Sequence, residues 1–586
     1  MASDQIFGTT PPMSVALPTE SEKRASDALI EELRRQKTFE KPSDTEKRYT
    51  SKGLDLLTIV VNTSLYKVLE SLQQICDEFV KRVAREKEPQ NDVLIKNARG
   101  KIFTYGSFRL GVFGPGSDID TLVVAPKYVT RDDYFQHFPE MLQSMAPKGA
   151  ITDLTVVTDA FVPVIKFEYS GISIDLIFSR VIQKQLSPEF RDLRDSGLLR
   201  GLDEKELRSL NGTRVTDEIL TLVPEQSTFK LALRAIKLWA QRRALYGNIM
   251  GFPGGVAWAM LVARVCQLYP KAATSVIVNK FFLVMSQWRW PQPVLLKPIE
   301  KGSLPVRVWN PQIYKSDSFH LMPIITPAYP SMCATFNIGR SSMSIITEEL
   351  RRGLAISESI MMGKQPWSDL FVKQTFFTSD YKYYISVTSA SKSKEAHKIW
   401  SGYVESKIRM LVQKLEQHSY IALAHAFNKG YNRRHHCKTD SELAQVQEGS
   451  LDFVQKELGD SQTPNSSGLN STSAEDTEVV DSTEVFTTTH YIGLRLSAAA
   501  KSLDLSYQVD EFKALCIQWK KYEDELKPLV SLGVQHVRCF DLPDDVFESG
   551  EKKPQKKSTK IKKREAPEDN APPPAKKQQT SVAAAG

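Results

Sequence analysis

The chain has 586 residues, of which 41% are hydrophobic and 25% charged, and its formal net charge is +8. Because this length exceeds one ordinary hydrophobic core, we expect two to four domains. No segment approaches the roughly 20 apolar residues that span a bilayer, and the polar N-terminus lacks a secretion signal, so we expect neither a membrane protein nor a secreted one. Six cysteines without a C-x-x-C pair favour reduced thiols inside the cell.

Helices and strands mix in the first 215 residues. We expect residues 1–40 to form an extended leader that enters a helix near Ser26 to Lys37, and residues 41–215 to form an α/β or α+β domain. Apolar residues at helical spacing predict a long helix over 54–85. The strands that we predict are apolar runs bounded by turn residues: 102–105, 118–125, 162–169 and 172–178, the last two joined as a hairpin.

A helical domain is predicted for residues 216–365. Residues 228–246 contain neither Pro nor Gly, and Gly247 then gives a helix stop signal. Polar residues of this helix recur at helical spacing and form one stripe: Lys230, Arg234, Lys237 and Gln241. Such stripes usually face solvent. Residues 256–268 are apolar on nearly every side, which predicts a buried helix.

A third domain, of the α+β class, is predicted for residues 366–545. We expect strands over 371–378, 383–389 and 490–496 and a helix over 394–417, which together would form a β-α-β module. A flexible insertion is expected at about 440–488, because its residues 462–484 are rich in Ser, Thr, Asn and acids.

The positive charge is concentrated near the C-terminus, where we expect residues 546–586 to be a disordered basic tail. From Ser549 to Gly586 there are ten Lys or Arg and four Asp or Glu, a net of +6 that leaves +2 for the rest of the chain. The basic tract from Lys552 to Arg564 predicts either a nuclear localisation signal or a nonspecific RNA tether. The alternative is a tail that only aids solubility.

Two aspartates one residue apart, Asp118 and Asp120, follow a glycine-rich stretch. Alternate residues of a strand point to the same face, so these side chains would project together from Cα atoms about 7 Å apart. A third carboxylate, Asp175, lies within an apolar predicted strand. Because buried carboxylates need a cationic partner, the trio predicts a site for two divalent metal ions, as used in nucleotidyl transfer. The alternative is that Asp118 and Asp120 only punctuate a turn after Gly116.

Gly106-Ser107 ends a predicted strand upstream of these aspartates. A strand that ends in Gly-Ser and turns into a helix presents backbone N–H groups and a hydroxyl to the phosphates of a nucleotide. Neither a P-loop motif nor G-x-G-x-x-G is present, which removes the P-loop and Rossmann alternatives.

This order of motifs resembles the nucleotidyltransferase superfamily that includes DNA polymerase β. The run from Leu231 to Arg243, followed by Tyr246, Asn248 and the segment Gly251–Trp258, is similar to the nuclear poly(A) polymerases of eukaryotes, and to the fungal ones in particular. The resemblance covers roughly residues 10–545. It implies a polymerase β-like nucleotidyltransferase domain, a helical central domain and a C-terminal domain that resembles an RNA-recognition fold.

The resemblance also implies roles for the matching residues. Asp118, Asp120 and Asp175 would ligate two Mg²⁺ ions, for which Mn²⁺ could substitute, and Asp175 would assist the attacking RNA 3′-hydroxyl. The residues implied to bind the triphosphate, sugar or adenine of ATP are Gly106, Ser107, Asn211, Lys237, Tyr246, Asn248, Gly254, Gly255 and Val256. The lysines expected to hold the RNA backbone are Lys392, Lys394, Lys398 and Lys407.

We therefore expect a template-independent polynucleotide adenylyltransferase that adds AMP from ATP to the 3′ end of pre-mRNA in the nucleus. The resemblance implies a monomeric catalytic subunit that works with a cleavage and polyadenylation factor complex and not at a membrane. One alternative is another template-independent RNA nucleotidyltransferase, uridylyl- or CCA-adding. The other is an inactive RNA-binding scaffold, which the three intact aspartates disfavour.

Overall fold

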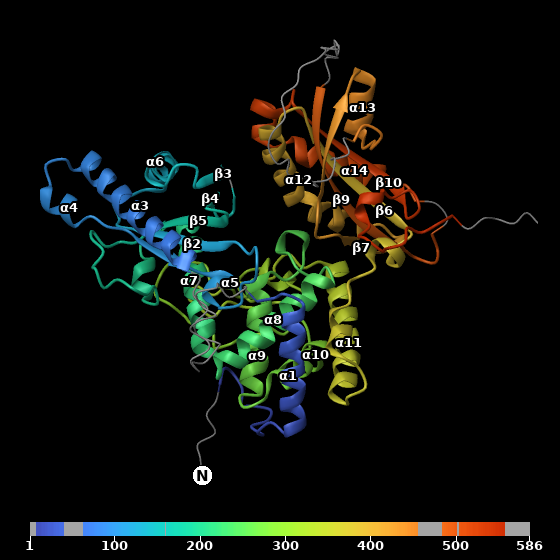
Figure 1. Cartoon of the computed structure of the whole chain (residues 1–586), viewed down its shortest axis with the longest axis horizontal. Helices are drawn as coiled ribbons and strands as arrows, with labels where there is room; N and C mark the ends of the chain where they lie inside the picture. The colour runs from blue at the N-terminus through green and yellow to red at the C-terminus, as the bar shows by residue number, and fades with distance from the viewer. Residues whose placement is uncertain (1–6, 40–62, 159, 455–482, 501–502, 557–586) are drawn as a thin grey trace, which may run out of the picture.

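The computed structural model describes residues 7–39, 63–158, 160–454, 483–500 and 503–556. Figure 1 shows two parts that contain sheets, at the upper left and upper right, and a set of helices below both. The first sheet belongs to the N-terminal half of the chain and the second to the C-terminal part. In the part of the chain that is described, no helix combines the length and the apolar character that crossing a membrane would require.

The first sheet has the strand order β1-β2-β5-β4-β3, and within it β2 and β5 pair in parallel while the other pairs are antiparallel. Its strands are β1 (Lys101–Thr104), β2 (Ile119–Ala125), β3 (Ile151–Val157), β4 (Val164–Tyr169) and β5 (Ile172–Arg180). Helices α3 (Thr63–Lys87) and α6 (Arg131–Met145) pack on one face, and α7 (Glu204–Leu222) packs on the other. This arrangement follows from apolar residues on both sides of β2 and β5.

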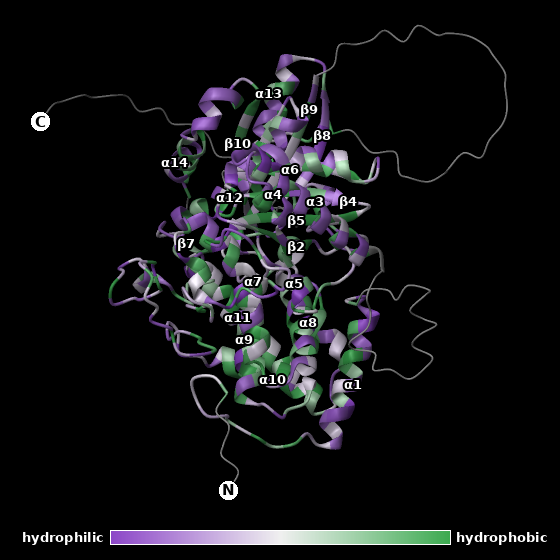
Figure 2. Cartoon of the chain, turned by 90° about the vertical axis from the view of Figure 1, so that its left-hand side faces the viewer, coloured by the Kyte–Doolittle hydropathy of each residue, from purple (hydrophilic) through white to green (hydrophobic). Residues whose placement is uncertain are grey.

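The central helices supply much of the largest apolar core, which continues into the C-terminal domain at Tyr384, Trp400 and Ile408. They are α8 (Gln226–Arg242), α9 (Gly255–Leu268), α10 (Thr274–Ser286) and α11 (Arg340–Met361), and the N-terminal helix α1 (Glu20–Arg35) packs against α10. Every residue of α9 from Ala257 to Leu268 is buried, as its composition predicts, and Figure 2 shows α9 and α10 as largely hydrophobic. The leader is therefore part of the central domain and not an appendage to it.

The C-terminal sheet has the order β10-β6-β9-β7, with β8 also paired to β9. Its elements are β6 (Tyr383–Ser391), α12 (Lys394–Leu415), β7 (Ile421–Ala426), β8 (Tyr431–Cys437), α13 (Asp440–Glu448), β9 (Thr483–Leu496), α14 (Ser506–Ile517) and β10 (Val530–Arg538). Helix α12 packs against β6, β7 and β9, and α14 packs against α12. The predicted pairing of 383–389 with 490–496 in one sheet is confirmed.

Several predicted boundaries differ from those observed. The leader helix begins at Glu20 and not near Ser26, because Thr19 and Glu22 form a capping box there. Helix α8 ends at Arg242, four residues early, because Ala244 takes a left-handed φ of +57°. The expected boundary between residues 215 and 216 falls inside α7, which continues to Leu222. The predicted helix over 54–85 is confirmed from Thr63 onward, and its first part lies outside the described residues.

In the C-terminal half one predicted strand is absent, and the bounds of the insertion and of the tail differ from those expected. Residues 371–378 do not form a strand: a 3₁₀ helix ends at Phe371, and a π-helical turn begins at Phe376, with Phe376 and Phe377 both buried. The expected insertion of 440–488 contains α13 at its start and the first residues of β9 at its end. Residues 455–482, between them, lie outside the described residues. Residues 546–556 of the expected tail have a described conformation, in which Lys553 and Lys556 pair with Asp544 and Asp541 after β10, and residues 557–586 lie outside the described residues.

Candidate active site

The parallel pair β2 and β5 brings two of the predicted aspartates together. Asp120 and Asp175 are register partners across this pair, so their side chains leave the same face of the sheet, on strands about 4.8 Å apart. Asp118 precedes β2 by one residue and lines the same cavity as Asp120. Two of the predicted carboxylates therefore lie side by side on the interior strands β2 and β5, and the third lies just before β2.

Lys166 adds a positive charge to this group. It is the register partner of Asp175 on β4, and its ammonium group forms an ion pair with the Asp175 carboxylate. The sequence analysis did not single out Lys166. The signal that could have identified it is a charged residue at the centre of the apolar segment 164–169, directly across the hairpin from Asp175.

The surroundings of Asp120 raise the pKa of its carboxyl group from 3.8 to about 7. Burial is the largest cause, followed by the negative charges of Asp175 and Asp118, and it outweighs the opposite effects of Lys166 and Lys237. Burial also raises the pKa of Tyr246 to about 12, with a smaller effect from Asp120. The site therefore has an excess of negative charge that favours binding of a cation.

Gly106 lets the chain pass close to Asp120. It begins the short helix α5 (Gly106–Arg109) with a φ of +61°, and a Cβ atom at this position would overlap with the Asp120 carboxylate. The Gly106 N–H donates a hydrogen bond to Thr216 Oγ1 at 3.3 Å. Only glycine satisfies both the backbone conformation and the contact.

A cavity of about 460 Å³ opens beside these groups. It lies between the first sheet, α8 and α9, and its lining residues are Gly106, Ser107, Leu110, Val112, Gly116, Ser117, Asp118, Asp120, Thr216, Leu233, Lys237, Gln241, Tyr246, Gly255, Val256 and Trp258. Six of the predicted ATP-binding residues are among them: Gly106, Ser107, Lys237, Tyr246, Gly255 and Val256. Asp118 and Asp120 lie on the same lining, which brings predicted metal ligands and predicted ATP contacts into one cavity.

Three predicted ATP-binding residues do not line this cavity. Asn211 lies on α7, where its side-chain Oδ1 is buried without a hydrogen-bond partner. Asn248 begins a short 3₁₀ helix, and its backbone carbonyl accepts a hydrogen bond from Asn337. Gly254 precedes α9, and a Cβ atom there would lie 3.7 Å from the Cβ of Asn248. Asn248 and Gly254 thus support the wall that carries Gly255.

Three residues of the polar stripe of α8, Lys230, Arg234 and Lys237, are partly buried, whereas Gln241 at its end is exposed. Lys237 and Gln241 line the cavity, and Lys230 packs close to Gly111 of the segment that precedes β2. Burial lowers the pKa of Lys237, with a further contribution from the charge of Arg234, while Asp120 acts in the opposite direction. The sequence analysis noted Gln241 only as part of the stripe and missed Ser117 and Thr216 as cavity residues.

The four lysines expected to bind RNA lie near the start of α12 or along it. The Lys392 N–H donates a hydrogen bond to the carbonyl of Leu529, and Lys394 is the first residue of the helix. Lys407 Nζ lies 4.8 Å from the ring centroid of Tyr403. The contact of Lys392 is made by its backbone, and that of Lys407 by its ammonium group.

Lys398 contacts the other sheet-containing domain. Its Nζ lies 3.8 Å from Asp153 Oδ1 on β3, and the two side chains are 50% and 71% exposed. A register shift in β3 and a left-handed φ of +50° set Asp153 apart from the regular strand. This ion pair joins the C-terminal domain to the domain that carries the three aspartates.

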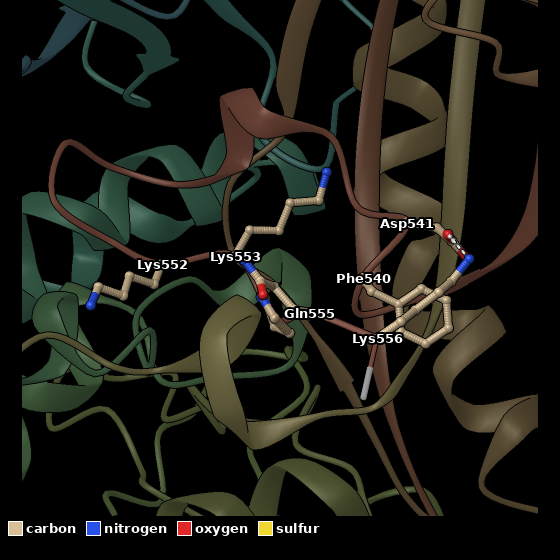
Figure 3. A pocket seen from close by; sticks show the side chains of 7 residues that line it. Phe540, Asp541, Lys552, Lys553, Gln555 and Lys556 are labelled. Atoms are coloured by element: carbon tan, nitrogen blue, oxygen red, sulfur yellow. Dashed lines mark ion pairs between the residues drawn. The ribbon is translucent and has the colours of Figure 1, made fainter. Parts of the chain in front are cut away.

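The beginning of the basic tail lies against residues 540–544, which follow β10 (Figure 3). Lys556 forms an ion pair with Asp541 at 3.7 Å and lies 4.6 Å from the ring centroid of Phe540, while Lys553 pairs with Asp544 at 2.9 Å. The pocket between these residues contains none of the predicted catalytic or ATP-binding side chains. The first lysines of the tail are therefore partly neutralised by acidic residues of their own domain.

The carboxylate group offers donors suited to a hard divalent cation. Within the described residues, no group of three or more His, Cys, Asp and Glu is arranged to hold a metal ion. The donors available at the site, from Asp118, Asp120 and Asp175, are all carboxylate oxygens, which Mg²⁺ and Mn²⁺ prefer. The pKa of Asp120 is raised first by burial and then by the charges of Asp175 and Asp118, and a bound cation would offset that second contribution, so the residues fit the ion chemically.

Comparison with known families covers nearly the whole chain. The poly(A) polymerase nucleotidyltransferase domain matches residues 8–223, the poly(A) polymerase central domain 228–373, and the poly(A) polymerase predicted RNA-binding domain 375–556. The chain belongs to the poly(A) polymerase family. Nucleotidyltransferases of this kind are typically metal-dependent, and the three domains of the polymerase follow the expected order.

Individual relatives agree with this assignment. The polymerase is 50% identical to poly(A) polymerase pla1 of Schizosaccharomyces pombe, with 94% of this chain and 95% of that protein covered. It is 45% identical to poly(A) polymerase PAPa of Candida albicans, again with 94% and 95% covered. A solved structure of Cid1 is 14% identical and covers 60% of this chain and 99% of that one, with a TM-score of 0.37. The assignment rests on the two fungal relatives and the family matches.

Gly106→Ala tests the close approach of the chain to Asp120. The added methyl group would collide with the carboxylate and strain a left-handed φ, so we expect nucleotidyl transfer to fall by a factor on the order of 10² to 10³. The measurement is the steady-state rate of RNA extension, with circular dichroism to confirm folding. Gly149→Ala is the control, since Gly149 has a φ of +78° but no atom within 4 Å of the added Cβ. Equal losses in both variants would contradict the argument.

Asp120→Asn tests the electrostatic cost of the site. Because the folded pKa of about 7 lies above the ordinary 3.8, the carboxylate reduces stability fully above pH 7, and this cost declines as pH falls toward 3.8. In Mg²⁺-free buffer we expect the variant to have a higher Tm than the natural protein at pH 8, by on the order of a few degrees, and a smaller difference at pH 5. Scanning calorimetry at both pH values checks this. A variant less stable at pH 8 would show that Asp120 is not under electrostatic strain.

Proposed function

We propose that this poly(A) polymerase adds AMP from ATP to the 3′ end of pre-mRNA, in the nucleus, as a monomeric catalytic subunit of a cleavage and polyadenylation factor complex. The observation that carries the proposal is the cavity that combines Asp118 and Asp120 with Gly106, Ser107 and Lys237 beside the register partner Asp175. The near-complete coverage of fungal poly(A) polymerases supports the same reaction.

Asp118, Asp120 and Asp175 are the residues that would hold two Mg²⁺ ions, or Mn²⁺ in their place. When bound, such ions lower the pKa of the attacking hydroxyl and offset charge on the departing pyrophosphate. Asp175 is best placed to orient the RNA 3′-hydroxyl, because it lies beside Asp120 in register but outside the lining of the ATP cavity. The ion pair with Lys166 would have to open or adjust for Asp175 to act in this way.

The triphosphate would bind between α5 and α8. Ser107 offers a hydroxyl and a backbone N–H from one side of the cavity, and Lys237 offers an ammonium group from the other. Burial lowers the pKa of Lys237 in the absence of nucleotide, and the negative charge of the phosphates would favour its protonated form. The lysine would then stabilise charge that develops on the pyrophosphate.

The adenine base would lie toward the start of α9. Tyr246, Gly255 and Val256 line this part of the cavity, and a Cβ atom at Gly255 would lie 2.6 Å from the Tyr246 hydroxyl. A larger residue at 255 would therefore displace the tyrosine. Asn248 and Gly254 would act from behind this wall, and Asn211 from α7 near the sugar and the RNA end.

Nucleotide preference tests the function directly. We expect the purified enzyme, given Mg²⁺ and a short oligo(A) primer, to incorporate ATP at least about 10-fold faster than UTP, CTP or GTP. Asp175→Ala should reduce extension by a factor on the order of 10³ while primer binding, measured by fluorescence anisotropy, stays within about twofold. Preference for UTP or CTP would favour the uridylyl- or CCA-adding alternative. Extension at the normal rate by Asp175→Ala would refute the metal assignment.

The RNA backbone would bind along α12 through Lys392, Lys394, Lys398 and Lys407. We expect Lys398→Gln and Lys407→Gln each to weaken RNA binding and to reduce the slope of log K against log salt concentration by about 0.7. Anisotropy titrations from 50 to 300 mM salt would measure the slope. Lys364→Gln is the control, since Lys364 is exposed just after α11. An unchanged slope in both α12 variants would place the RNA elsewhere.

A further inference from the structure

Arg234 joins three parts of the chain that are far apart in sequence. It lies on α8 one turn before Lys237, and its guanidinium donates hydrogen bonds to the carbonyl oxygens of Thr38 at 2.7 Å, Phe113 at 2.8 Å and Gly111 at 3.0 Å. Its Cζ also lies 4.7 Å from the ring centroid of Phe39. One side chain thus connects α8, the end of the N-terminal leader and the segment between α5 and β2.

That last segment, residues 111–117, which we call the aspartate loop, leads directly into the active site. Gly116 and Ser117 line the cavity, and Asp118 follows at once. The loop contains no helix or strand; Gly114 and Ser117 form a turn in it, in which the Gly114 N–H donates to Ser117 Oγ at 3.1 Å and the Ser117 N–H donates to the Gly114 carbonyl at 3.0 Å. Its conformation therefore depends strongly on external partners, of which Arg234 supplies two hydrogen bonds.

The leader closes directly on the same loop. A Cβ atom at Gly114 would lie 3.1 Å from the Thr38 carbonyl oxygen, so this glycine permits a close approach of the two backbones. The Thr38 carbonyl also accepts one of the Arg234 hydrogen bonds, while its N–H donates to the carbonyl of Leu33 at the end of α1. Leader, loop and Arg234 form one connected unit.

The arginine fork suits this task better than any other side chain. Its planar group carries five N–H donors in fixed directions, so it can reach several carbonyl oxygens without changing conformation. A lysine at the same position concentrates its donors on one nitrogen and would reach fewer of the three carbonyls. The arrangement is therefore sensitive to a substitution that keeps the charge.

We propose that Arg234 is a positioning residue for nucleotidyl transfer, which fixes the aspartate loop on α8 and makes its conformation depend on the N-terminal leader. Arg234 acts through Ser117 and Asp118 and does not contact the reacting atoms itself. The proposal rests on the proposed function only in assigning Asp118 to the metal site. The connection among leader, loop and helix stands without that assignment.

The experiment compares Arg234→Lys and Arg234→Met in the full chain. In metal-free enzyme, amide hydrogen exchange of residues 37–39 and 111–117 should rise about 10-fold or more in Arg234→Met and by an intermediate amount in Arg234→Lys. The Mg²⁺ concentration for half-maximal extension should rise about 10- to 100-fold and kcat should fall, while the KM for RNA stays within about twofold. Arg243→Lys is the matched control, because Arg243 caps the same helix and pairs with Glu349 away from the loop.

Gly114→Ala gives an independent test that leaves Arg234 in place. Its added methyl group should push the Thr38 carbonyl away and raise exchange in both the leader and the loop. Natural exchange rates in Arg234→Met, or equal changes in Arg243→Lys, would overturn the proposal. A looser loop with an unchanged Mg²⁺ requirement would also overturn it while leaving the proposed function intact, whereas a preference of the natural enzyme for UTP would refute that function alone.

Discussion

The partial burial of Asp120 beside a second carboxylate, Asp175, is the constraint on which the active site depends. Parallel pairing of β2 and β5 places the two residues in register, and burial raises the pKa of Asp120 more than the neighbouring charges do. The apolar residues on both faces of these strands fix the register, since a shift by one residue would turn the aspartates into the opposite core. The fold thus holds together a charge group that would separate in a less constrained chain.

Helix α8 connects this charge group to the largest apolar core. Trp239 is buried and makes edge contacts with Trp258 and Phe282. Another side of the same helix carries Leu233 and Lys237, one turn apart, to the cavity. Because the core fixes the helix, the lysine is held near Asp120 at a cost in solvation that appears as its lowered pKa. Helix α8 therefore contributes both to the stability of the central domain and to the position of a positive charge in the active site.

Short sequence patterns predicted the buried strands, the buried helix and the aspartates of the site, because each of these depends on neighbouring residues in the chain. The apolar runs of β2 and β5, the all-apolar α9 and the aspartates could be read from short segments, because burial on all sides of a strand or helix leaves a continuous run of apolar residues. The partner of a side chain leaves no such signal. Lys166 opposite Asp175 depends on strand register, and the contacts of Arg234 depend on carbonyls up to 196 residues away. Phe376 and Phe377 favoured a strand over 371–378, because aromatic residues have a high β-propensity. Both are buried in a π-helical turn, and the tertiary packing that holds them there leaves no local signal.

The ion pair between Lys398 and Asp153 bears on how RNA would enter. Both side chains are exposed, so the pair stabilises the contact between the two domains by only about 0–1 kcal/mol. A backbone phosphate carries one full negative charge shared by two non-bridging oxygens, and counterion release adds to its affinity for a lysine. If Lys398 holds the RNA backbone, the incoming strand would therefore replace Asp153 as its partner. The contact that now joins the domains would pass to the RNA, which would then itself connect α12 to the domain of the aspartates.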